Sequence, residues 1–500
     1  MTATRSPLRP SRGRLAPRDD ARGVHVERRP ELDGLAPMDV AETFRDLPGL
    51  ALLESARPGR KARWSFLTAD PVALLSSPTA GRDPFAEARR LVARLDPGPI
   101  NAAAVGETLP PFLGGLVGYL AYDLGHALER LPTIARDDQA LPLLRLGLHD
   151  WVVAFDRRHG RAWLAGRAVD GDRLGLGRRL AAVRARLERG PRPPSRPVPD
   201  VRTEPLTFRS SLDRAAYESG VEAIRAAIAL GDIYQANLTR RLSTRFRADP
   251  WPLYRALRTG DPALFAAYLD LGRDERPRGP ASPGSAGSPG RRAIVSASPE
   301  PFLSVDRSGL VATDPIKGTR PRGATPEEDR ALAAELLASA KDRAENVMIV
   351  DVLRNDLGRV CRPGSVRVPR LCRLERTAAV QHLVSTVTGR LAPRRDAFDL
   401  LAASFPGGSI TGAPKIRAME ILEELEPVRR GPYTGAALWL GPDGAMASSI
   451  LIRTFVADGT RLSLNVGGGI TWRSDPAAEW DETVAKARGP LRAIGGREVA

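Results

Sequence analysis

The segment from Gly435 to Trp472 constrains the fold more than any other part of the chain. Short apolar and β-branched runs alternate there with the turn sequences GPDG and ADGT, a pattern that predicts about three or four strands. Neighbouring strands joined by such short turns run antiparallel. The segment therefore predicts an antiparallel sheet near the C-terminal end of the chain.

Helices are predicted on both sides of the strand-rich segments. Apolar residues recur at helical spacing over 213–231, which ends in a glycine. Thr325, Pro326 and Glu328 combine an N-cap, a first-turn proline and a capping box, and predict a helix that runs past Lys341. Further helices are predicted over 414–425 and from residue 475 onward. Long helices beside hairpins predict a mixed α/β (α+β) protein with antiparallel sheets.

Stretches rich in Pro, Gly, Ser and Arg divide the chain. Residues 1–30 predict a disordered Arg/Pro-rich tail, 191–205 a linker, and 272–292 a disordered loop inserted between two strand-like runs. The chain between them forms an N-terminal region, 31–190, and a larger unit, 206–495.

The formal net charge of +16 raises the question of a nucleic-acid partner. The arginines gather in the predicted tail and loop, without a basic helix or interleaved aromatic residues, so nucleic-acid binding is not expected. No apolar run approaches the roughly 18 residues of a membrane span, and the basic N-terminus lacks the apolar core of a signal peptide. The two cysteines, Cys361 and Cys372, exclude a disulfide framework. We expect a cytoplasmic protein.

Two of the predicted helices each carry a pair of acids. Asp342 precedes Glu345 by three residues, and Glu479 precedes Glu482 by three. Residues at this spacing share a helix face, so each helix can present both carboxylates to one point. Converging acids would repel one another unless a cation sat among them, and oxygen-only ligands favour Mg²⁺. The spacing is equally compatible with solvated helix faces.

Two loops could approach a ligand closely. The segment SITGAPK, Ser409–Lys415, leads into a helix N-terminus, where backbone amides and the Thr411 hydroxyl would suit a carboxylate. Gly467–Gly469 follow a strand and permit close backbone approach. A plain loop–helix junction and a β-bulge are the alternatives.

Three further residues carry reactive groups. Lys317 in DPIKGTRPRG is a nucleophile if its charge is suppressed, and otherwise a solvated lysine. Glu300 in SASPE is a general acid if buried, or a turn residue. His382 in VQHLVS is by default a core histidine.

Together and in order, these segments resemble the chorismate-utilising enzyme family, which includes anthranilate synthase component I, aminodeoxychorismate synthase component I, and the isochorismate and salicylate synthases. The resemblance covers about residues 205–495 and rests on GDIYQANL, SASPE, PIKGTRPRG, KDRAENVMIVDVLRNDLGRV, VQHLVSTVTG, PGGSITGAPKIRAMEILEELEP, YTGA, ILIRTF, NVGGGI and EWDETVAKA. LLES and PFLGGLVGYLAYDLG resemble the family's first region. The resemblance implies two large antiparallel β-sheets packed as a sandwich with surrounding helices, as in anthranilate synthase component I.

The resemblance also implies site residues, with chorismate as substrate and Mg²⁺ as cofactor. Glu345 and Glu482 would hold the metal, supported through water by Glu479 and by Asp342, where the family usually has Glu. The implied catalytic residues are Lys317, Glu300 and His382. The implied substrate-binding residues are Gly318, Thr319, Thr411, Gly412, Tyr433, Arg453, Gly467, Gly468, Gly469 and Lys486.

Lys317 distinguishes the branches of the family. Anthranilate synthases resemble PIAGT at this position, whereas many aminodeoxychorismate synthases carry PIKGT. Such a lysine can attack C2 of chorismate while Glu300 protonates the departing C4 hydroxyl, and ammonia then enters C4 and expels the lysine. Isochorismate and salicylate synthases use a water-activating lysine where this chain has Gln235. The predicted activity is therefore that of a transferase forming 4-amino-4-deoxychorismate for p-aminobenzoate and folate, with anthranilate formation as the alternative.

The resemblance further implies a partner and a second pocket. Both cysteines lie inside the chorismate-binding segment, so no glutaminase nucleophile is predicted, and a separate glutamine amidotransferase subunit should form a heterodimer with this chain and supply ammonia. A separate pyridoxal-phosphate lyase would then release p-aminobenzoate. The family's tryptophan pocket uses the serine of LLES, here Ser55, but Leu264 stands at its expected proline. The family motif SPERF reads SPEPF, with Pro301 at the arginine.

Overall fold

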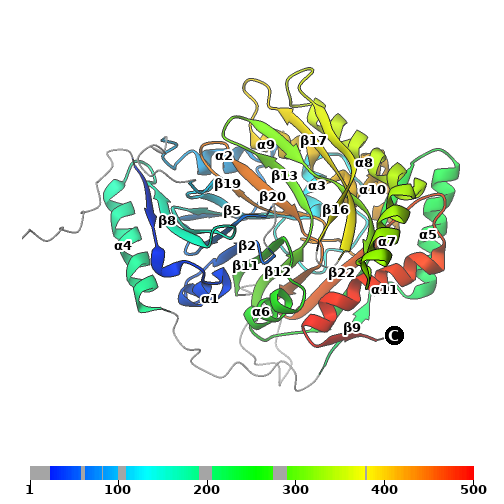
Figure 1. The fold of residues 1–500 in the computed structure, drawn as a ribbon, viewed down its shortest axis with the longest axis horizontal. Coiled ribbons are helices and arrows are strands. Elements are labelled where there is room, and N and C mark those ends of the chain that lie inside the picture. The colour runs from blue at the N-terminus through cyan, green and yellow to red at the C-terminus, as the bar shows by residue number, and fades with distance from the viewer. Residues whose placement is uncertain are drawn as a thin grey trace, which may run out of the picture.

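Two large β-sheets face each other in this computed structural model, which describes residues 23–57, 62–81, 83–98, 109–190, 205–273, 290–377 and 380–499 (Figure 1). The larger sheet has 13 strands. Their order is β1 (Val24–Arg28), β8 (Arg161–Arg167), β7 (Trp151–Asp156), β3 (Trp64–Thr68), β2 (Ala51–Glu54), β11 (Phe265–Arg273), β12 (Arg291–Ser298), β21 (Thr454–Asp458), β22 (Arg461–Ile470), β10 (Gln235–Arg245), β9 (Leu206–Ser210) and β23 (Gly496–Glu498), with β18 (Gly412–Ala413) also paired to β10.

The smaller sheet has 10 strands. Their order is β15 (Ile316–Pro321), β17 (Val380–Arg390), β14 (Leu310–Thr313), β13 (Pro301–Val305), β20 (Met446–Ile450), β19 (Ala436–Leu440), β5 (Gly115–Leu120), β6 (Leu144–His149) and β4 (Ala73–Leu75), with β16 (Arg367–Arg376) paired to β17. Within the described ranges, strand pairs of both sheets are antiparallel apart from the parallel pair β9–β23. The predicted antiparallel sandwich is therefore confirmed.

The sheets pack through their apolar inner faces. Ala51, Phe66 and Ile294 of the larger sheet belong to the same buried cluster as Val117 and Trp439 of the smaller one. The rings of Phe66 and Trp439 lie 5.6 Å apart, edge to face. Burial of aromatic side chains on this scale is a main source of stability, so this cluster joins the two layers.

Helices cover the outer faces of the sandwich (Figure 1). On the larger sheet, α1, α4, α6 and α11 bury a second apolar cluster, and α5 and α10 close a further one over β10 and β22. On the smaller sheet, α2, α8 and α9 cover the inner strands. The helix bounds are α1 (Pro37–Ala41), α2 (Ala86–Val92), α3 (Gly125–Leu128), α4 (Arg173–Arg189), α5 (Arg214–Ala229), α6 (Trp251–Gly260), α7 (Pro326–Ala338), α8 (Ala340–Gly358), α9 (Ala397–Ser404), α10 (Lys415–Leu425) and α11 (Pro476–Ala493). None of the helices in the described ranges is long and apolar enough to cross a membrane.

Most elements predicted from the sequence are present. The segment 435–472 forms the four strands β19–β22. Asp213 caps α5 by accepting a hydrogen bond from the Ala216 amide, and Asp475 caps α11 in the same way. Thr325 caps α7, but Glu328 accepts from the amide of Ala324 and so completes no capping box.

The helix predicted from Thr325 past Lys341 is wrong in one respect, because it is two helices. Ser339 adopts an extended conformation (ψ 105°), which ends α7, and its hydroxyl accepts a hydrogen bond from the Asp342 amide, which begins α8. An internal serine can cap a helix as readily as continue one. The break changes the direction of the chain. The acid pair, Asp342 and Glu345, therefore lies on α8 alone.

The predicted low-complexity boundaries also need correction. Residues 24–28 of the predicted tail form β1, which pairs with β8, while residues 1–22 lie outside the described part. The predicted loop begins and ends inside strands β11 and β12, which pair as far as Arg273 and Arg291. The Arg291 guanidinium also binds the Asp270 carboxylate across them at 2.9 Å. The rest of that loop, 274–289, and linker residues 191–204 are not described. Strands from 31–190 and from 206–495 share both sheets, so the two regions form one structure.

Candidate active site

A cavity of about 660 Å³ lies where β10 and β22 of the larger sheet meet β15 and β17 of the smaller one. Helices α8 and α11 close its sides. The predicted site residues that line it are Glu300, Lys317, Gly318, Thr319, Asp342, Glu345, His382, Tyr433, Arg453, Gly467, Gly468, Gly469, Glu479, Glu482 and Lys486. A volume of this size suits a small metabolite. Segments nearly two hundred residues apart in sequence therefore meet in one pocket.

Lys317 and Glu300, the predicted nucleophile and general acid, both line the cavity. Burial lowers the pKa of the Lys317 amine, although the charges of Glu345 and Glu300 oppose that shift. Burial likewise raises the pKa of the Glu300 carboxyl, against the charge of Lys317. Both shifts favour the uncharged forms, a neutral amine and a protonated acid. These are the forms that a nucleophile and a general acid require.

Gly318 explains how α8 comes so close to Lys317. Its φ of 77° lies in the left-handed region, and a Cβ there would meet the Asp342 Cβ at 2.8 Å. The β15–β17 register shifts between Lys317 and Thr319. A bulge at a glycine turns a side chain out of the pleat, which directs Lys317 toward the cavity.

His382 lies beside Thr319 on the neighbouring strand, with Nδ1 2.9 Å from the threonine hydroxyl. Burial, helped by the charge of Arg453, lowers the pKa of His382 to about 4. The imidazole is therefore neutral near pH 7 and can act as a hydrogen-bonding group, not as a cation.

The four acids approach the cavity from two helices. Asp342 and Glu345 come from α8, and Glu479 and Glu482 from α11. Burial raises the pKa values of Glu345 and Glu479, and the other acids add to this effect. The pKa of Glu482 is lowered because, despite burial, the ammonium of Lys486 lies 2.7 Å away.

Carboxylate oxygens are suitable ligands for a hard cation. In this structure, however, three of the four acids contact cationic side chains of the protein. Lys486 binds Glu482, the Lys341 ammonium lies 3.9 Å from Glu345, and Arg320 donates to Asp342 at 3.3 Å. Among the described residues, no three His, Cys, Asp or Glu side chains are close enough together to hold an ion. Oxygen-only donors suit Mg²⁺, so binding would require these carboxylates to exchange lysine contacts for the metal.

Gly468 lies directly against the acids of α11. A Cβ at this position would be 2.9 Å from Glu479 Oε2 and 3.9 Å from Glu482 Oε1. Glu479 cannot withdraw freely, because its other oxygen accepts a hydrogen bond from Ser474 at 2.6 Å. The absence of a side chain on this strand is thus what leaves room for the two carboxylates.

We expect Gly468→Ala to lower kcat/KM for chorismate by about tenfold while leaving the fold intact, because the methyl group displaces Glu479. Steady-state kinetics and thermal melting measure the two effects. Gly358→Ala, at the end of α8 with nothing within 4 Å of the added Cβ, is the matched control. Equal kinetics for the two variants would contradict this account of Gly468.

The remaining predicted binding groups surround the glycines. The Lys486 ammonium donates to the Gly467 carbonyl at 2.8 Å. Tyr433 is buried, which raises the pKa of its hydroxyl, and Arg453 reaches Asp261 at 3.6 Å. Two cationic side chains and a phenol can hold an anionic substrate here.

Thr411 and Gly412 do not lie at the cavity, contrary to the sequence prediction. Thr411 is fully buried and its hydroxyl donates back to the Gly407 carbonyl at 3.0 Å. Gly412 belongs to β18, where a Cβ would meet the Gln235 carbonyl oxygen at 2.3 Å. The serine of the same motif, Ser409, lines the cavity instead. Lys415, at the start of α10, binds Asp356.

Pro301 follows a Glu300 whose backbone is held by hydrogen bonds on both sides. It is the first residue of β13, a place where proline is tolerated in a strand. The Glu300 amide donates to the Ser298 hydroxyl at 3.2 Å, and its carbonyl accepts from the Ile450 amide at 3.1 Å.

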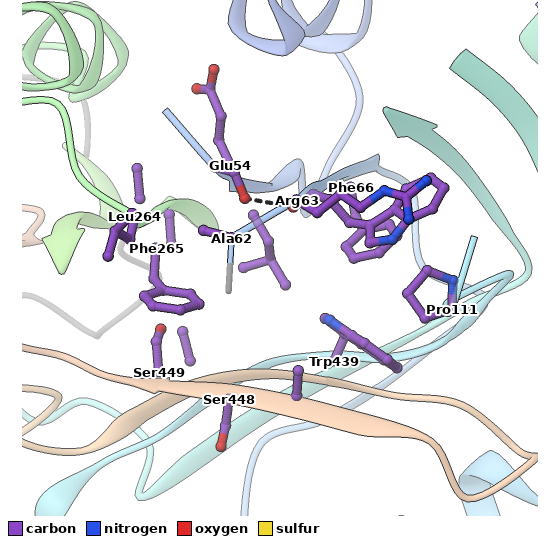
Figure 2. A pocket seen from close by; sticks show the side chains of 17 residues that line it. Glu54, Ala62, Arg63, Phe66, Pro111, Leu264, Phe265, Trp439, Ser448 and Ser449 are labelled. Atoms are coloured by element: carbon purple, nitrogen blue, oxygen red, sulfur yellow. Dashed lines mark hydrogen bonds between the residues drawn. The ribbon is translucent and has the colours of Figure 1, made fainter. Parts of the chain in front are cut away.

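Ser55 lines a second cavity, of about 380 Å³, between the two sheets. Figure 2 shows Phe66, Pro111 and Trp439 on one side of it and Leu264 with Phe265 on the other. The Ser55 hydroxyl donates to the Trp64 carbonyl at 2.8 Å. The Glu54 carboxylate points away from the cavity, where Tyr254 and Arg258 donate to it. Leu264, which stands where the family has a proline, forms part of the wall of this cavity.

The fold has counterparts among known proteins. The crystal structure of anthranilate synthase component I from Streptococcus pneumoniae superimposes with a TM-score of 0.73 at 30% identity, covering 87% of this chain and 93% of that one. The model of the chorismate binding enzyme family matches residues 52–492. The fold is thus that of anthranilate synthase component I. The chain belongs to the family of chorismate binding enzymes, and it is a chorismate-utilising enzyme.

Two curated relatives are similar to almost the same degree. Aminodeoxychorismate synthase component 1 of Klebsiella aerogenes is 43% identical over 75% of this chain and 76% of that protein. Anthranilate synthase component 1 of Streptomyces coelicolor is 41% identical over 90% of this chain and 84% of that protein. Overall identity does not separate the two branches, so the residues of the cavity must.

Proposed function

We propose that this chain is component 1 of an aminodeoxychorismate synthase, which converts chorismate and ammonia to 4-amino-4-deoxychorismate for p-aminobenzoate and folate. The observation that carries this proposal is the place of Lys317. Its amine faces the cavity with a lowered pKa, beside a glutamate whose pKa is raised. The alanine of a PIAGT sequence could supply no nucleophile at this point.

In the first step the neutral amine of Lys317 forms a bond to C2 of chorismate, both ring double bonds shift (C1=C2 to C1=C6, and C5=C6 to C4=C5), and the bond from C4 to its hydroxyl oxygen breaks. Glu300 gives its proton to the departing oxygen, which leaves as water. The surplus proton on the lysine nitrogen then returns to the Glu300 carboxylate. Dividing a difficult substitution in this way lowers its barrier.

In the second step ammonia bonds to C4, both ring double bonds shift back, and the bond between C2 and the lysine nitrogen breaks. One proton passes from the new C4 ammonium to the departing lysine nitrogen, so Lys317 leaves as a neutral amine. The net change replaces the hydroxyl at C4 by an amino group and releases water. The enolpyruvyl ether is never cleaved, so pyruvate is not formed.

The substrate is held by its two carboxylates. Lys486, Arg453 and Tyr433 lie on the walls of the cavity where an anion would bind, together with the backbone of 467–469. When bound, Mg²⁺ supplies positive charge for the ring carboxylate, and Glu345 and Glu482 are its proposed ligands. Glu479 and Asp342 would support them through water. His382, as a neutral group, positions the ring with Thr319 and Gly318.

Ammonia is proposed to come from a separate glutamine amidotransferase subunit that forms a heterodimer with this chain. Both relatives are named component 1, which supports a partner component. A separate pyridoxal-phosphate lyase would convert the product to p-aminobenzoate.

The test is the identity of the product. The native protein is incubated with chorismate, MgCl₂ and ammonium at alkaline pH, where free ammonia replaces the partner. We expect 4-amino-4-deoxychorismate, which an added lyase converts to p-aminobenzoate. Fluorescent anthranilate with an equivalent of pyruvate would instead show an anthranilate synthase and overturn the proposal.

A further inference from the structure

Ser409 lies at the centre of a rigid turn beside the reactive pair. The turn is a short 3-10 helix, Gly408–Ile410, between α9 and β18. Three successive carbonyls of this segment accept hydrogen bonds from distant parts of the chain. The Asn237 side-chain amide donates to the Ser409 carbonyl at 2.6 Å, Arg430 to the Ile410 carbonyl at 3.0 Å, and the Asn237 backbone amide to the Thr411 carbonyl at 2.8 Å.

The packing of the turn leaves Ser409 little freedom to move. A Cβ on Gly408 would meet Val352 of α8 at 2.6 Å, so α8 presses directly on the turn. Asn237 is itself 8% exposed, and its side-chain oxygen accepts from Gln235 at 3.1 Å. Polar groups held on both sides in this way keep a fixed orientation.

Ser409 contacts both reactive groups at once. Its hydroxyl donates to Glu300 Oε1 at 3.0 Å. Its carbonyl oxygen accepts from Lys317 Nζ at 3.2 Å. One residue thus joins the strand that carries the nucleophile to the loop that carries the acid.

We propose that Ser409 is a positioning residue that aims both the Lys317 amine and the Glu300 proton at the substrate. The inference rests on the proposed function, in which Lys317 is the nucleophile and Glu300 the acid. It adds a role for a residue that contacts neither the leaving group nor the attacked carbon in that mechanism.

The contact with Glu300 decides which oxygen carries the proton. Because Oε1 accepts from Ser409, we assign the proton of the neutral acid to Oε2, the oxygen left for the departing hydroxyl. As that proton leaves, Glu300 becomes a carboxylate, and a hydrogen bond to a carboxylate is stronger than one to a neutral acid. The Ser409 hydroxyl therefore stabilises the product of proton transfer more than the starting state.

The contact with Lys317 sets the direction of the nitrogen lone pair. A neutral amine has two N–H groups and one lone pair. Donation of one N–H to the Ser409 carbonyl, which Asn237 fixes from the other side, limits rotation of the amine about its last bond. Holding a nucleophile in the attacking orientation contributes to rate without any new contact to the substrate.

The charges facing Glu300 are those of Lys317 on β15 and Lys486 on α11, both of which lower its pKa. The hydrogen bond from Ser409 acts in the same direction, against burial, which raises the pKa. Removal of the hydroxyl alone leaves both lysines in place. The pKa of Glu300 should then rise.

The experiment compares Ser409→Ala, Ser409→Cys and Ser409→Thr with the native protein in the chorismate and ammonium assay. We expect kcat to fall about 10- to 100-fold in the alanine and cysteine variants, with KM for chorismate within about twofold. Ser409→Thr keeps a hydroxyl and should recover most of the rate. Ser409→Cys keeps the size of the side chain, so it tests the role even if the alanine variant folds poorly.

The pH profile distinguishes positioning from a merely structural role. Glu300 must be protonated to act, so the rate falls as pH rises through its pKa. Because this pKa rises without the hydroxyl, the falling limb should move to higher pH in the alanine and cysteine variants. An unmoved limb, or a kcat within twofold of native, would overturn the role of Ser409. Anthranilate as the native product would be seen before any variant is compared, and would overturn the proposed function instead.

Discussion

Lys317→Ala is expected to lower kcat for 4-amino-4-deoxychorismate by about three orders of magnitude or more, because it removes the group that bonds to C2. Chorismate should still bind, since the carboxylate-binding side chains on α11 and β22 are untouched. The rate is followed by coupling the product to a lyase and measuring p-aminobenzoate. Binding is followed separately by the rise in melting temperature with chorismate.

Lys317→Arg is the matched variant for charge. A guanidinium keeps the positive charge but cannot be deprotonated in a protein, so we expect it to be as inactive as the alanine variant. The native rate should rise with pH through the pKa of Lys317, which burial places below its ordinary value of 10.5. Formation of the same product by Lys317→Ala at a near-native rate would mean that ammonia attacks C4 directly.

Glu345→Gln is expected to raise the Mg²⁺ concentration for half-maximal activity about 10- to 100-fold, because an amide replaces a charged ligand of the same shape. Activity at low Mg²⁺ should fall accordingly. Calorimetric titration of Mg²⁺ into the protein with chorismate present gives a readout that does not depend on turnover. Excess chelator should abolish the activity of the native protein.

The control for this variant lies on the same helix. Asp351 is exposed on α8 and pairs with Arg354 at 2.9 Å, so Asp351→Asn removes an equal charge away from the cavity. It should leave the Mg²⁺ requirement unchanged. A Glu345→Gln protein with native Mg²⁺ affinity would remove Glu345 from the ligand set.

Much of the fold follows from local sequence. The turns GPDG and ADGT set the hairpins β19–β20 and β21–β22, and Asp213 caps α5 where the periodicity predicts a start. These are short-range effects that residues of neighbouring sequence decide. The break at Ser339 does not follow from the sequence, because a serine before an acid-rich turn can either cap a helix or continue one. Only the packing of α8 on β17 decides between them.

The composition of the site depends on contacts between segments that are distant in the sequence. The acid pairs were predicted from their helical spacing, yet nothing in either helix alone shows that α8 and α11 face one cavity. The segment SITGAPK contains two side-chain hydroxyls, those of Ser409 and Thr411. The sequence predicts that Thr411 binds the substrate, whereas Ser409 is the one that lines the cavity. This difference depends on β18 pairing with β10 and on Asn237, about 170 residues earlier, binding the turn.

The division of the acids between two layers has a consequence for how the molecule holds together. Helix α8 packs on β17 and β15 of the smaller sheet, while α11 packs on β22 of the larger one. A ligand that contacts both helices links the two sheets across the cavity. It therefore resists motion that separates the sheets. Amide hydrogen exchange at the ends of β15 and β22 should therefore slow together when the cavity is filled, although the two strands share no hydrogen bonds. The proposed catalytic site is therefore also a place where the two sheets are held together.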